Sequence, residues 1–557
     1  MSTNLMVRPS GTAARSFRAV GVWRDGGLIS DLRKWRDETP DALAIKAYRA
    51  DGEPVQIDYG EYARRVERFA GALYELGVRP GQVVACQLPN WWQAQVLLLA
   101  AARLGAVVAP IMTTIGAREL ERMLDRLDAS VCVTVDEWAG FAYAAALREI
   151  AARLPRLQHR VVIGSPAEGE IEFESFFEAT AWEQRHPVAL DDMTEDPDRV
   201  AMVLFTSGTT GEPKAALHTQ NTWYSTTSGL SEALEVTHQD VIFTPHSLMH
   251  AMGQIYSQMS LLVGACRVLL DSWSGERGLA VLADSATTQF SGAPSFVYDL
   301  IAATDGAPAL PALRVIACHS TTVPKPLVAE VAAVFGVTLR AGWGMTEVGT
   351  CTRTRADDPA DWAAYSDGRP LRGIELDLRS DTDITKDQPA RLFVRGGGVC
   401  LATVGRDSGM LTVIADHDDG WYDTGDLAVP DGRGGIRLMG RVSDRIGGVF
   451  MIPVNDVESE LLDHPAVSDV ALVGYPDGQG GELACAVIVP ATTPPVALDE
   501  LRRCLSDKGM TDWFLPTRLE YLQEPPRNGS GKVRKELLRR WLASGADIPE
   551  ITRAASS

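Results

Sequence analysis

The chain has 557 residues, of which 45% are hydrophobic and 23% are charged, and its formal net charge is −20. A chain of this length exceeds what one hydrophobic core supports, so we expect at least two domains. The negative charge repels nucleic acid and anionic membrane surfaces and excludes a general binder of either, although a local basic pocket remains compatible with it.

The sequence has no feature of a secreted or membrane-spanning protein. Residues 1–21 are polar and lack the apolar core of a signal peptide. The longest apolar stretch, residues 96–112, is interrupted by Arg103, Gly105 and Pro110, which argues against a membrane span. The eight cysteines are scattered and form no C-x-x-C pattern. We therefore expect a cytoplasmic protein with reduced thiols.

From residue 29 to about residue 370 the sequence alternates between helical and strand patterns. After a loosely held arm at residues 1–28, helices are expected at residues 32–35, 62–76, 92–104 and 118–127, and strands at 83–88, 106–110 and 130–135. Further strands are expected at residues 200–205, 241–245, 267–270, 289–292, 314–317 and 338–341. This alternation predicts an α/β domain with a largely parallel sheet.

The pattern changes after about residue 370. Four short strands, at residues 374–378, 391–394, 411–414 and 436–439, predict a small antiparallel unit. Beyond a junction at residues 441–446, helices at 454–462 and 498–508 and strands at 467–475 and 483–489 predict a separate domain. The expected fold is α/β, with a large multi-sheet domain at residues 29–440 and a small, mobile α+β domain at residues 441–557.

The most informative stretch is residues 206–214, Thr-Ser-Gly-Thr-Thr-Gly-Glu-Pro-Lys, directly after the strand at residues 200–205. Gly208 and Gly211 permit a tight bend, and successive N–H groups in such a turn form an anion-binding concavity. The hydroxyls and Lys214 add donors and positive charge, so we interpret the loop as a polyphosphate site rather than a flexible surface loop. It is not a Walker P-loop, because the G-x-x-x-x-G-K-[ST] pattern is missing.

Four further stretches carry suitable side chains. Residues 342–347, Gly-Trp-Gly-Met-Thr-Glu, offer a ring for a heterocycle, a hydroxyl for phosphate and a carboxylate for Mg²⁺. Residues 420–426 end in a carboxylate suited to a ribose diol, residues 440–444 contain an arginine, and residues 526–532 end in a glycine-flanked lysine. Taken singly, each has a structural alternative: a packed turn, a common loop, a solvated Arg–Asp turn and a flexible tail.

Together, in this order, the five stretches resemble the adenylate-forming superfamily of acyl-CoA synthetases, peptide-synthetase adenylation domains and luciferases. The resemblance covers roughly residues 30–541, and two softer matches are Gly-Ala-Pro at 292–294 and His-x-x-Gly at 250–253. It implies that a carboxylate attacks the α-phosphate of ATP to give acyl-AMP and pyrophosphate, and that a thiol, usually CoA, then displaces AMP. It also implies that the small domain rotates between the two steps.

The resemblance further implies a role for each matched residue. ATP binding is expected of Thr206, Ser207, Gly208, Thr209, Thr210, Gly211, Lys214, Trp343, Gly344, Met345, Thr346, Asp426, Arg441 and Lys532. The expected catalytic residues are Thr206, Glu347 and Lys532, with Glu347 as the Mg²⁺ ligand. The expected acyl pocket contains His250, Gly253, Gly292, Ala293 and His319. Ser443 stands at the hinge position, where Asp or Lys is commoner.

Two places depart from the family pattern. Residues 318–324 read Cys-His-Ser-Thr-Thr-Val-Pro, where relatives usually have Gly-Gly-Ala before a proline. His319 there either reshapes the acyl pocket or is a buried histidine without substrate contact. Residues 444–453 are about one residue shorter than usual and more apolar, in the segment that lines the thiol tunnel of relatives. The acceptor is therefore CoA by first choice, with a carrier-protein phosphopantetheine as the alternative.

The expected substrate is a cyclic, aromatic or short-to-medium aliphatic acid, because the expected pocket residues include no acidic or basic one. As a whole the chain looks most like bacterial alicyclic and aryl acid ligases, such as cyclohexanecarboxylate-CoA ligases. The expected partners are the acid, ATP and CoA, with Mg²⁺ and without nucleic acid; an oligomer is compatible with the sequence. An alternative from a different class is an inactive relative that senses ATP or acyl-AMP. The sequence argues against it because it contains the whole set of Lys214, Glu347, Asp426, Arg441 and Lys532.

Overall fold

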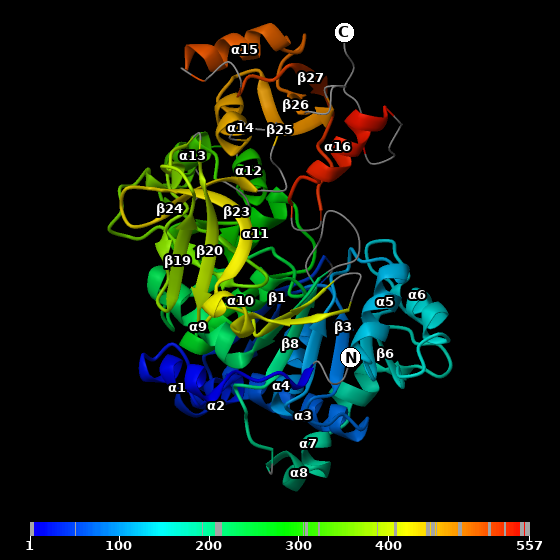
Figure 1. The fold of residues 1–557 in the computed structure, drawn as a ribbon. Helices are drawn as coiled ribbons and strands as arrows, with labels where there is room; N and C mark the ends of the chain where they lie inside the picture. The colour runs from blue at the N-terminus through cyan, green and yellow to red at the C-terminus, as the bar shows by residue number, and fades with distance from the viewer. Residues whose placement is uncertain are drawn as a thin grey trace.

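The computed structural model describes residues 5–50, 52–191, 193–205, 214–304, 306, 310–320, 323–386, 388–405, 409–441, 446, 452, 454–476, 482–508, 510, 514–528, 531–545 and 551. A large body carries the N-terminal three quarters of the chain, and a smaller body with the C-terminal elements lies above it in Figure 1. The predicted fold class, a large α/β domain followed by a smaller α+β domain, is confirmed.

The larger of the two main sheets, in the described part of the chain, has nine strands. Their spatial order is β22 (Leu411–Val413), β21 (Ala402–Val404), β9 (Ala215–Thr219), β8 (Val200–Phe205), β4 (Val107–Pro110), β3 (Val83–Gln87), β5 (Val131–Val135), β6 (His159–Ile163) and β7 (Ile171–Glu172). The strands from β4 to β7 are parallel, whereas β8 and β9 are antiparallel. The parallel strands are apolar because helices cover both of their faces.

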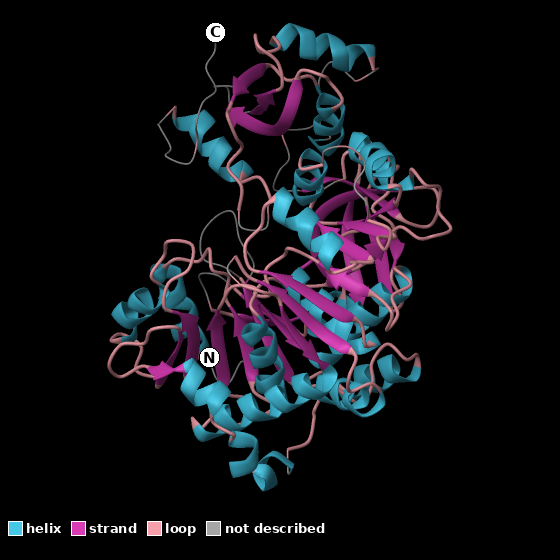
Figure 2. Cartoon of the chain, turned by 180° about the vertical axis from the view of Figure 1, so that it is seen from behind, coloured by secondary structure: helices cyan, strands magenta, loops and turns pink. Residues whose placement is uncertain are grey.

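Alternate side chains of this sheet enter two different cores. Val84 and Cys86 face α3 (Tyr59–Glu75) and α4 (Trp92–Arg103), a helix buried along its whole length. Val83 and Ala85 face the opposite side, with α5 (Ala117–Leu127) and α6 (Tyr143–Ala151). The period of two along a strand explains why one apolar run supplies both cores. Figure 2 shows helices on both sides of the strands.

The second main sheet has seven described strands and is also largely parallel. Their order is β14 (Thr338–Ala341), β13 (Val315–Cys318), β12 (Gln289–Gly292), β10 (Val241–Phe243), β11 (Cys266–Leu270), β1 (Leu43–Tyr48) and β2 (Val55–Asp58). Two helices, α9 (Gln220–Ala233) and α10 (Ala251–Val263), pack on its inner face, and α11 (Gly275–Asp284), α12 (Pro294–Ala302) and α13 (Lys325–Phe335) cover its outer face. The carboxyl ends of β10, β12, β13 and β14 therefore lie at one edge, where α/β sheets bind ligands.

An antiparallel sheet follows, made of β19 (Ile374–Arg379), β20 (Ala390–Gly396), β23 (Tyr422–Pro430) and β24 (Ile436–Arg441). One sequence assignment was wrong. The strand predicted at residues 411–414 does not join this unit, because β22 pairs with β21, which extends the nine-stranded sheet beyond β9. Local sequence gives the strand its extended form, but the choice of partner depends on contacts across the fold.

The C-terminal body contains a three-stranded sheet of β25 (Val467–Pro476), β26 (Glu482–Pro490) and β27 (Arg518–Tyr521). Helices α14 (Val454–Leu462) and α15 (Leu498–Asp507) pack on one face, and α16 (Lys535–Ser544) packs on the other. Lys325 on α13 forms an ion pair of 2.7 Å with Glu460 on α14, so a polar contact joins the two bodies. The predicted boundary at residue 441 stays a prediction, because residues 442–445 lie outside the described part of the chain.

The N-terminal segment is more firmly attached than predicted. Within residues 5–27, α1 (Gly11–Ala19) precedes Val22 and Trp23, whose side chains are buried. The indole N–H of Trp23 donates a hydrogen bond of 2.9 Å to the carbonyl of Gly397. The expectation of a loose arm was wrong for these residues, because Val22 and Trp23 are buried against Gly373 and Gly397, far away in the sequence. Helix α2 (Leu28–Glu38) then enters the main core.

The remaining elements are short and connect the main layers. They are η2 (Glu174–Ala179), α7 (Trp182–Arg185), α8 (Pro187–Asp191), β15 (Gly344–Met345), β16 (Gly349–Thr350), β17 (Thr352–Arg353), η3 (Trp362–Ala364), β18 (Arg369–Pro370), η4 (Ile414–Asp416) and η5 (Asp418–Gly420).

Candidate active site

The predicted phosphate loop lies between two paired strands. Residues 206–213, which include Thr206, Ser207, Gly208, Thr209, Thr210 and Gly211, lie outside the described part of the chain. Their flanks are described: Phe205 at the end of β8 pairs with Ala215 at the start of β9. Lys214 therefore lies at the end of the loop, beside the carboxyl end of β8.

Lys214 and Glu347 are joined through a tyrosine that the sequence interpretation did not single out. Lys214 Nζ donates a hydrogen bond of 2.9 Å to the hydroxyl of Tyr422, which donates one of 3.3 Å to Glu347 Oε1. Burial, and then the nearby Glu347 carboxylate, raises the pKa of Tyr422, so its phenol stays protonated and able to donate. The two residues expected to hold phosphate and metal thus lie close together. The sequence could have pointed to Tyr422 because it lies within the motif at residues 420–426, two residues before Thr424.

The residues expected near the nucleoside also meet. The indole N–H of Trp343 donates a hydrogen bond of 2.9 Å to Asp426 Oδ2, and both side chains are buried. Asp426 pairs in register with Arg441 on the neighbouring strand β24. Thr424 Oγ1 accepts a hydrogen bond of 3.0 Å from the Asp426 amide and so fixes the turn that carries the carboxylate. Three motifs therefore meet here: Trp343 contacts Asp426, and Asp426 lies opposite Arg441 on the neighbouring strand.

Thr346 is held by a second residue that the sequence interpretation missed. His218 on β9 is fully buried, and its Nε2–H donates a hydrogen bond of 2.7 Å to the Thr346 carbonyl. Its Nδ1 lies 3.0 Å from the hydroxyl of Thr222. Burial lowers the pKa of His218 to about 4, so the imidazole is neutral. Gly344 is required nearby, because a Cβ there would lie 2.2 Å from the Gly349 carbonyl.

The residues expected to line the acyl pocket come together at the carboxyl ends of β10, β12 and β13. His250 caps α10, with Nδ1 accepting a hydrogen bond of 3.3 Å from the Met252 amide. Gly253 is needed in that first turn, because a Cβ would lie 2.0 Å from the Ser247 carbonyl. The His319 amide donates a hydrogen bond of 3.3 Å to the carbonyl of Gly292, and Ala293 caps α12.

Three histidines of this region form a cluster. The ring centre of His246, which the sequence interpretation left unassigned, lies 4.8 Å from that of His319 and 5.9 Å from that of His250. Burial lowers the pKa of His246 to about 3 and that of His250 to about 4, and it lowers the pKa of His319 well below the ordinary value. The cluster is therefore uncharged at neutral pH.

The C-terminal lysine loop approaches the expected acyl residues from the other body. Gly531 lies so close that a Cβ added to it would come within 3.1 Å of Ser295 Oγ and 4.0 Å of the Ala293 Cβ. The Lys532 amide donates a hydrogen bond of 2.9 Å to Asn528 Oδ1, which keeps the loop in a tight turn. The structure thus brings the backbone that carries Lys532 beside the acyl residues, although about 240 residues separate them in sequence. Ser443, the expected hinge, lies outside the described residues.

A magnesium ion fits this site only as a shared ion. No group of three or more His, Cys, Asp or Glu residues that could hold a metal occurs among the described residues. Mg²⁺ is commonly bound by one or two carboxylates together with substrate phosphates and water. Glu347, buried and adjacent to Lys214 through Tyr422, suits that arrangement.

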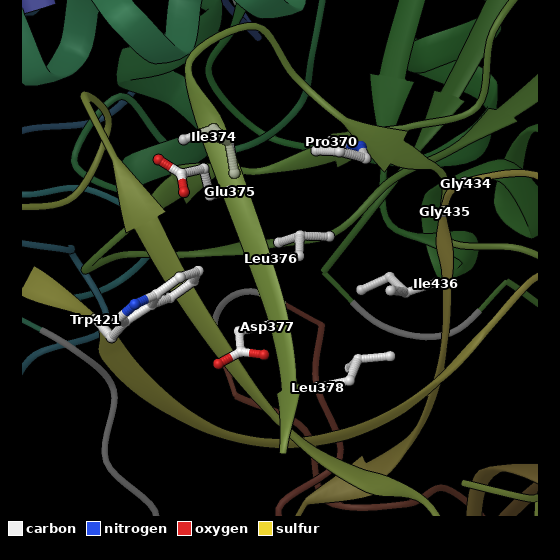
Figure 3. A pocket seen from close by; sticks show the side chains of 10 residues that line it. All are labelled: Pro370, Ile374, Glu375, Leu376, Asp377, Leu378, Trp421, Gly434, Gly435 and Ile436. Carbon is white, nitrogen blue, oxygen red and sulfur yellow. The ribbon is translucent and has the colours of Figure 1, made fainter. Parts of the chain in front are cut away.

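A groove elsewhere has unsuitable chemistry for a polyphosphate. It has a volume of about 540 Å³ and lies along β19. Figure 3 shows Leu376 and Leu378 facing Ile436, with Asp377 and Trp421 on the other side of the strand. Its lining contains carboxylates and no lysine or arginine, so we place the candidate active site at the sheet edges instead.

The chain matches known proteins over nearly its whole length. Residues 32–402 match the AMP-binding enzyme family, and residues 456–532 match the AMP-binding enzyme C-terminal domain. The chain therefore belongs to the AMP-binding enzyme family, and the resemblance inferred from its motifs is confirmed.

Its relatives include named acid–CoA ligases. A medium-chain fatty-acid–CoA ligase of Escherichia coli (strain K12) is 30% identical over 533 residues, which cover 94% of this chain and 92% of that protein. A salicyl-AMP ligase / salicyl-S-ArCP synthetase of Mycobacterium tuberculosis (strain ATCC 25618 / H37Rv) is 29% identical, with 95% and 93% covered. The structure of the anthranilate CoA ligase AuaEII in complex with anthranoyl-AMP has the same fold, with a TM-score of 0.81, 23% identity and coverage of 94% and 98%.

Among the described residues, no helix combines the length and the apolar character that a membrane crossing requires.

Tyr422→Phe should weaken the binding of Mg·ATP by about tenfold, because it removes hydrogen bonds to two charged groups. Titration calorimetry with ATP at several Mg²⁺ concentrations measures the effect. The matched control is Tyr365→Phe, which changes a half-exposed tyrosine and should leave binding unchanged. Equal affinity of Tyr422→Phe and wild type would contradict the proposed link between Lys214 and Glu347.

The buried histidines predict a loss of stability in mild acid. His218 has a native pKa of about 4 against an ordinary value of 6.5, so the unfolded chain takes up a proton first as the pH falls. The contribution of neutral His218 to the free energy of unfolding is complete above pH 6.5. It is about 2 kcal/mol smaller at pH 5, and it is lost near pH 4. Urea unfolding at pH 7.5 and pH 5 should show a lower midpoint in acid.

His218→Asn should reduce this pH dependence, whereas the control His417→Gln, at an exposed histidine, should preserve it. A midpoint that is the same at both pH values would show that the buried histidines do not become protonated on unfolding.

Proposed function

We propose that this protein is an AMP-forming acid–thiol ligase that activates a carboxylic acid with ATP and transfers the acyl group to CoA. The observation that carries the proposal is the approach of the Lys532 loop to Ala293 and Ser295 on one side of a site whose other side holds Lys214, Tyr422 and Glu347. We infer that Lys532 and Lys214 supply positive charge on both sides of the point where the two anions must meet.

In the first step, a carboxylate oxygen forms a bond to the α-phosphorus, and the bond from that phosphorus to the bridging oxygen of pyrophosphate breaks. Positive groups must offset the repulsion between the anionic reactants. Lys532 serves the carboxylate and the α-phosphate, and Lys214 with the hydroxyls of residues 206–210 orders the leaving pyrophosphate. Mg²⁺ held by Glu347 would neutralise phosphate charge. Asp426 and Arg441 hold the ribose, and Trp343 forms the wall beside the base.

In the second step, the sulfur of CoA forms a bond to the acyl carbon, the bond from that carbon to the AMP oxygen breaks, and the thiol proton passes to solvent. The C-terminal body must move away from the acyl pocket to admit the thiol, with the pivot at Ser443. The ion pair between Lys325 and Glu460 is a polar contact that such a movement would break and that water can replace. Polar contacts of this kind are typical of domains that move relative to each other.

The acceptor is CoA rather than a carrier protein. The names of several relatives, among them CoA ligases of Escherichia coli and Streptomyces carzinostaticus, support CoA, and the salicyl-S-ArCP synthetase supports the alternative. The acid is cyclic, aromatic or of short-to-medium chain length. We place the enzyme in the cytoplasm, which the eight unpaired cysteines support.

Acid-dependent exchange of pyrophosphate into ATP tests the first step. Across a panel of carboxylic acids, at least one should support exchange, and adding CoA should then give the matching thioester and AMP. No exchange with any acid would reject the enzyme. Exchange without a CoA thioester would favour a carrier protein as the acceptor.

Lys532→Ala should slow acyl-AMP formation from ATP by at least about a hundredfold, because it removes a charge from the reacting phosphate. The same variant should form thioester from supplied acyl-AMP and CoA at nearly the wild-type rate. Single-turnover measurements of each half-reaction, with the exposed-lysine variant Lys386→Ala as control, separate the two steps. An equal loss in both would mean that Lys532 is not specific to adenylation.

A further inference from the structure

The loop after β13 holds a serine in a strained conformation. Ser320 has a φ of +76°, in the left-handed region that glycine adopts freely and other residues rarely do. Its hydroxyl lies 2.9 Å from His319 Nδ1 and 3.4 Å from His246 Nε2. A strained residue persists when the surrounding structure gains from it, and such residues gather at functional sites. Here the gain is a hydroxyl that joins two imidazoles.

The bridge belongs to a longer chain of hydrogen bonds. His319 Nε2 lies 2.8 Å from Ser291 Oγ on β12, and His246 Nδ1 lies 3.2 Å from Thr244 Oγ1 after β10. Five side chains from three neighbouring strand ends are therefore connected. A neutral imidazole donates at one nitrogen and accepts at the other, so both nitrogens of each of these histidines are satisfied. His319 is consequently fixed in position by two hydrogen bonds.

This chain of hydrogen bonds lies next to the residues that the Lys532 loop approaches. The His319 amide bonds to the carbonyl of Gly292, and the next residue, Ala293, lies against Gly531 beside Lys532. An acid bound beside Ala293 with its carboxylate toward Lys532 would extend its other end toward His319. Phe296, partly exposed, meets the His246 ring edge-on at 5.3 Å and adds an aromatic wall.

Behind His319 the structure is closed. His319 is 3% exposed, and the ring of Tyr256, 1% exposed, stacks on it at a centroid distance of 5.9 Å and an angle of 25°. Two buried guanidinium groups lie beside these histidines: Arg353 donates a hydrogen bond of 3.1 Å to the Cys318 carbonyl, and Arg267 donates one of 3.4 Å to the Thr244 carbonyl. Positive charge at this depth repels a second cation, such as the ammonium group of an amino acid.

We propose that His319, held by the strained Ser320, closes the acyl pocket and restricts the acid to compact, uncharged cyclic or aromatic carboxylic acids. This inference rests on the proposed ligase function and narrows its substrate class. His319 is the specificity-determining residue, and Ser320 is a positioning residue that acts through it. Long straight chains are rejected by the closed end, and amino acids by the buried positive charge.

The test compares acids within each protein. Pyrophosphate exchange is measured with benzoate, cyclohexanecarboxylate, decanoate and phenylalanine for wild type and His319→Gly. Wild type should use the ring acids with at least about tenfold higher kcat/KM than decanoate, and His319→Gly should shift that ratio by at least about tenfold toward decanoate. The ratio is insensitive to a partial loss of folded protein, and His319→Asn replaces the glycine variant if the latter does not fold.

Ser320→Gly tests the positioning role. It keeps the left-handed backbone but removes the bridge, so it should shift the ratio in the same direction and by less. The matched control is Ala286→Gly, at another non-glycine residue with positive φ (52°) outside the pocket, which should leave the ratio unchanged. An unchanged ratio in Ser320→Gly would remove Ser320 from the proposal.

The possible outcomes distinguish a failure of the role proposed for His319 from a failure of the proposed ligase function. Exchange by wild type with an unaltered ratio in His319→Gly or His319→Asn would overturn the role of His319 and leave the ligase function standing. A wild-type preference for decanoate or phenylalanine would also overturn it. No exchange with any acid, in any variant, would reject the proposed function itself.

Discussion

The hydrogen bond from Lys214 to Tyr422, continued to Glu347, is the contact on which the rest of the site depends. It joins the end of the phosphate loop, the antiparallel sheet and the turn after β14. Each of these segments is fixed by its own sheet, so their meeting point is defined by the packing of rigid elements rather than by flexible loops. Because Tyr422 is buried and protonated, it keeps a lysine and a carboxylate close without letting them form a direct ion pair. Both charged groups then stay available to an anionic nucleotide and its cation.

The expected acyl side of the site is held together by hydrogen bonds between neutral groups. Here three histidines are neutral. His246 and His319 are buried, and hydroxyls lie within hydrogen-bonding distance of all four of their ring nitrogens, whereas the partly exposed His250 accepts a backbone hydrogen bond at Nδ1. A buried polar network of this kind is stable only when each member finds a partner, and it then has one preferred geometry. We propose that the half of the site with Lys214 and Glu347 binds phosphate and that the half with the neutral histidines binds the acid. This division suits a reaction in which only one end of the acid carries charge.

The two halves meet where the C-terminal body touches the large one. Gly531 adopts a positive φ and lies close to Ser295, so a residue with a Cβ would be strained there and would press on the Ser295 hydroxyl. Near the same junction, Lys325 binds Glu460, which also binds Lys508. Among the described residues, the hydrophobic clusters of the C-terminal body contain no side chain of the large body. Each body therefore has its own core, which is compatible with a rotation of one relative to the other.

The sequence by itself determined the family, the fold class and the set of motif residues, because those motifs depend on local chemistry: glycines where the backbone must bend, hydroxyls and a lysine where phosphate must bind. It also located many of the strands and some of the helices, since their apolar periodicity is local. It misplaced the strand at residues 411–414 and the attachment of residues 5–27, and it did not identify Tyr422, His218 or Ser320. Only the tertiary structure decided these points, because strand partners, burial and hydrogen bonds between segments up to 374 residues apart leave no periodic or motif-like trace along the chain.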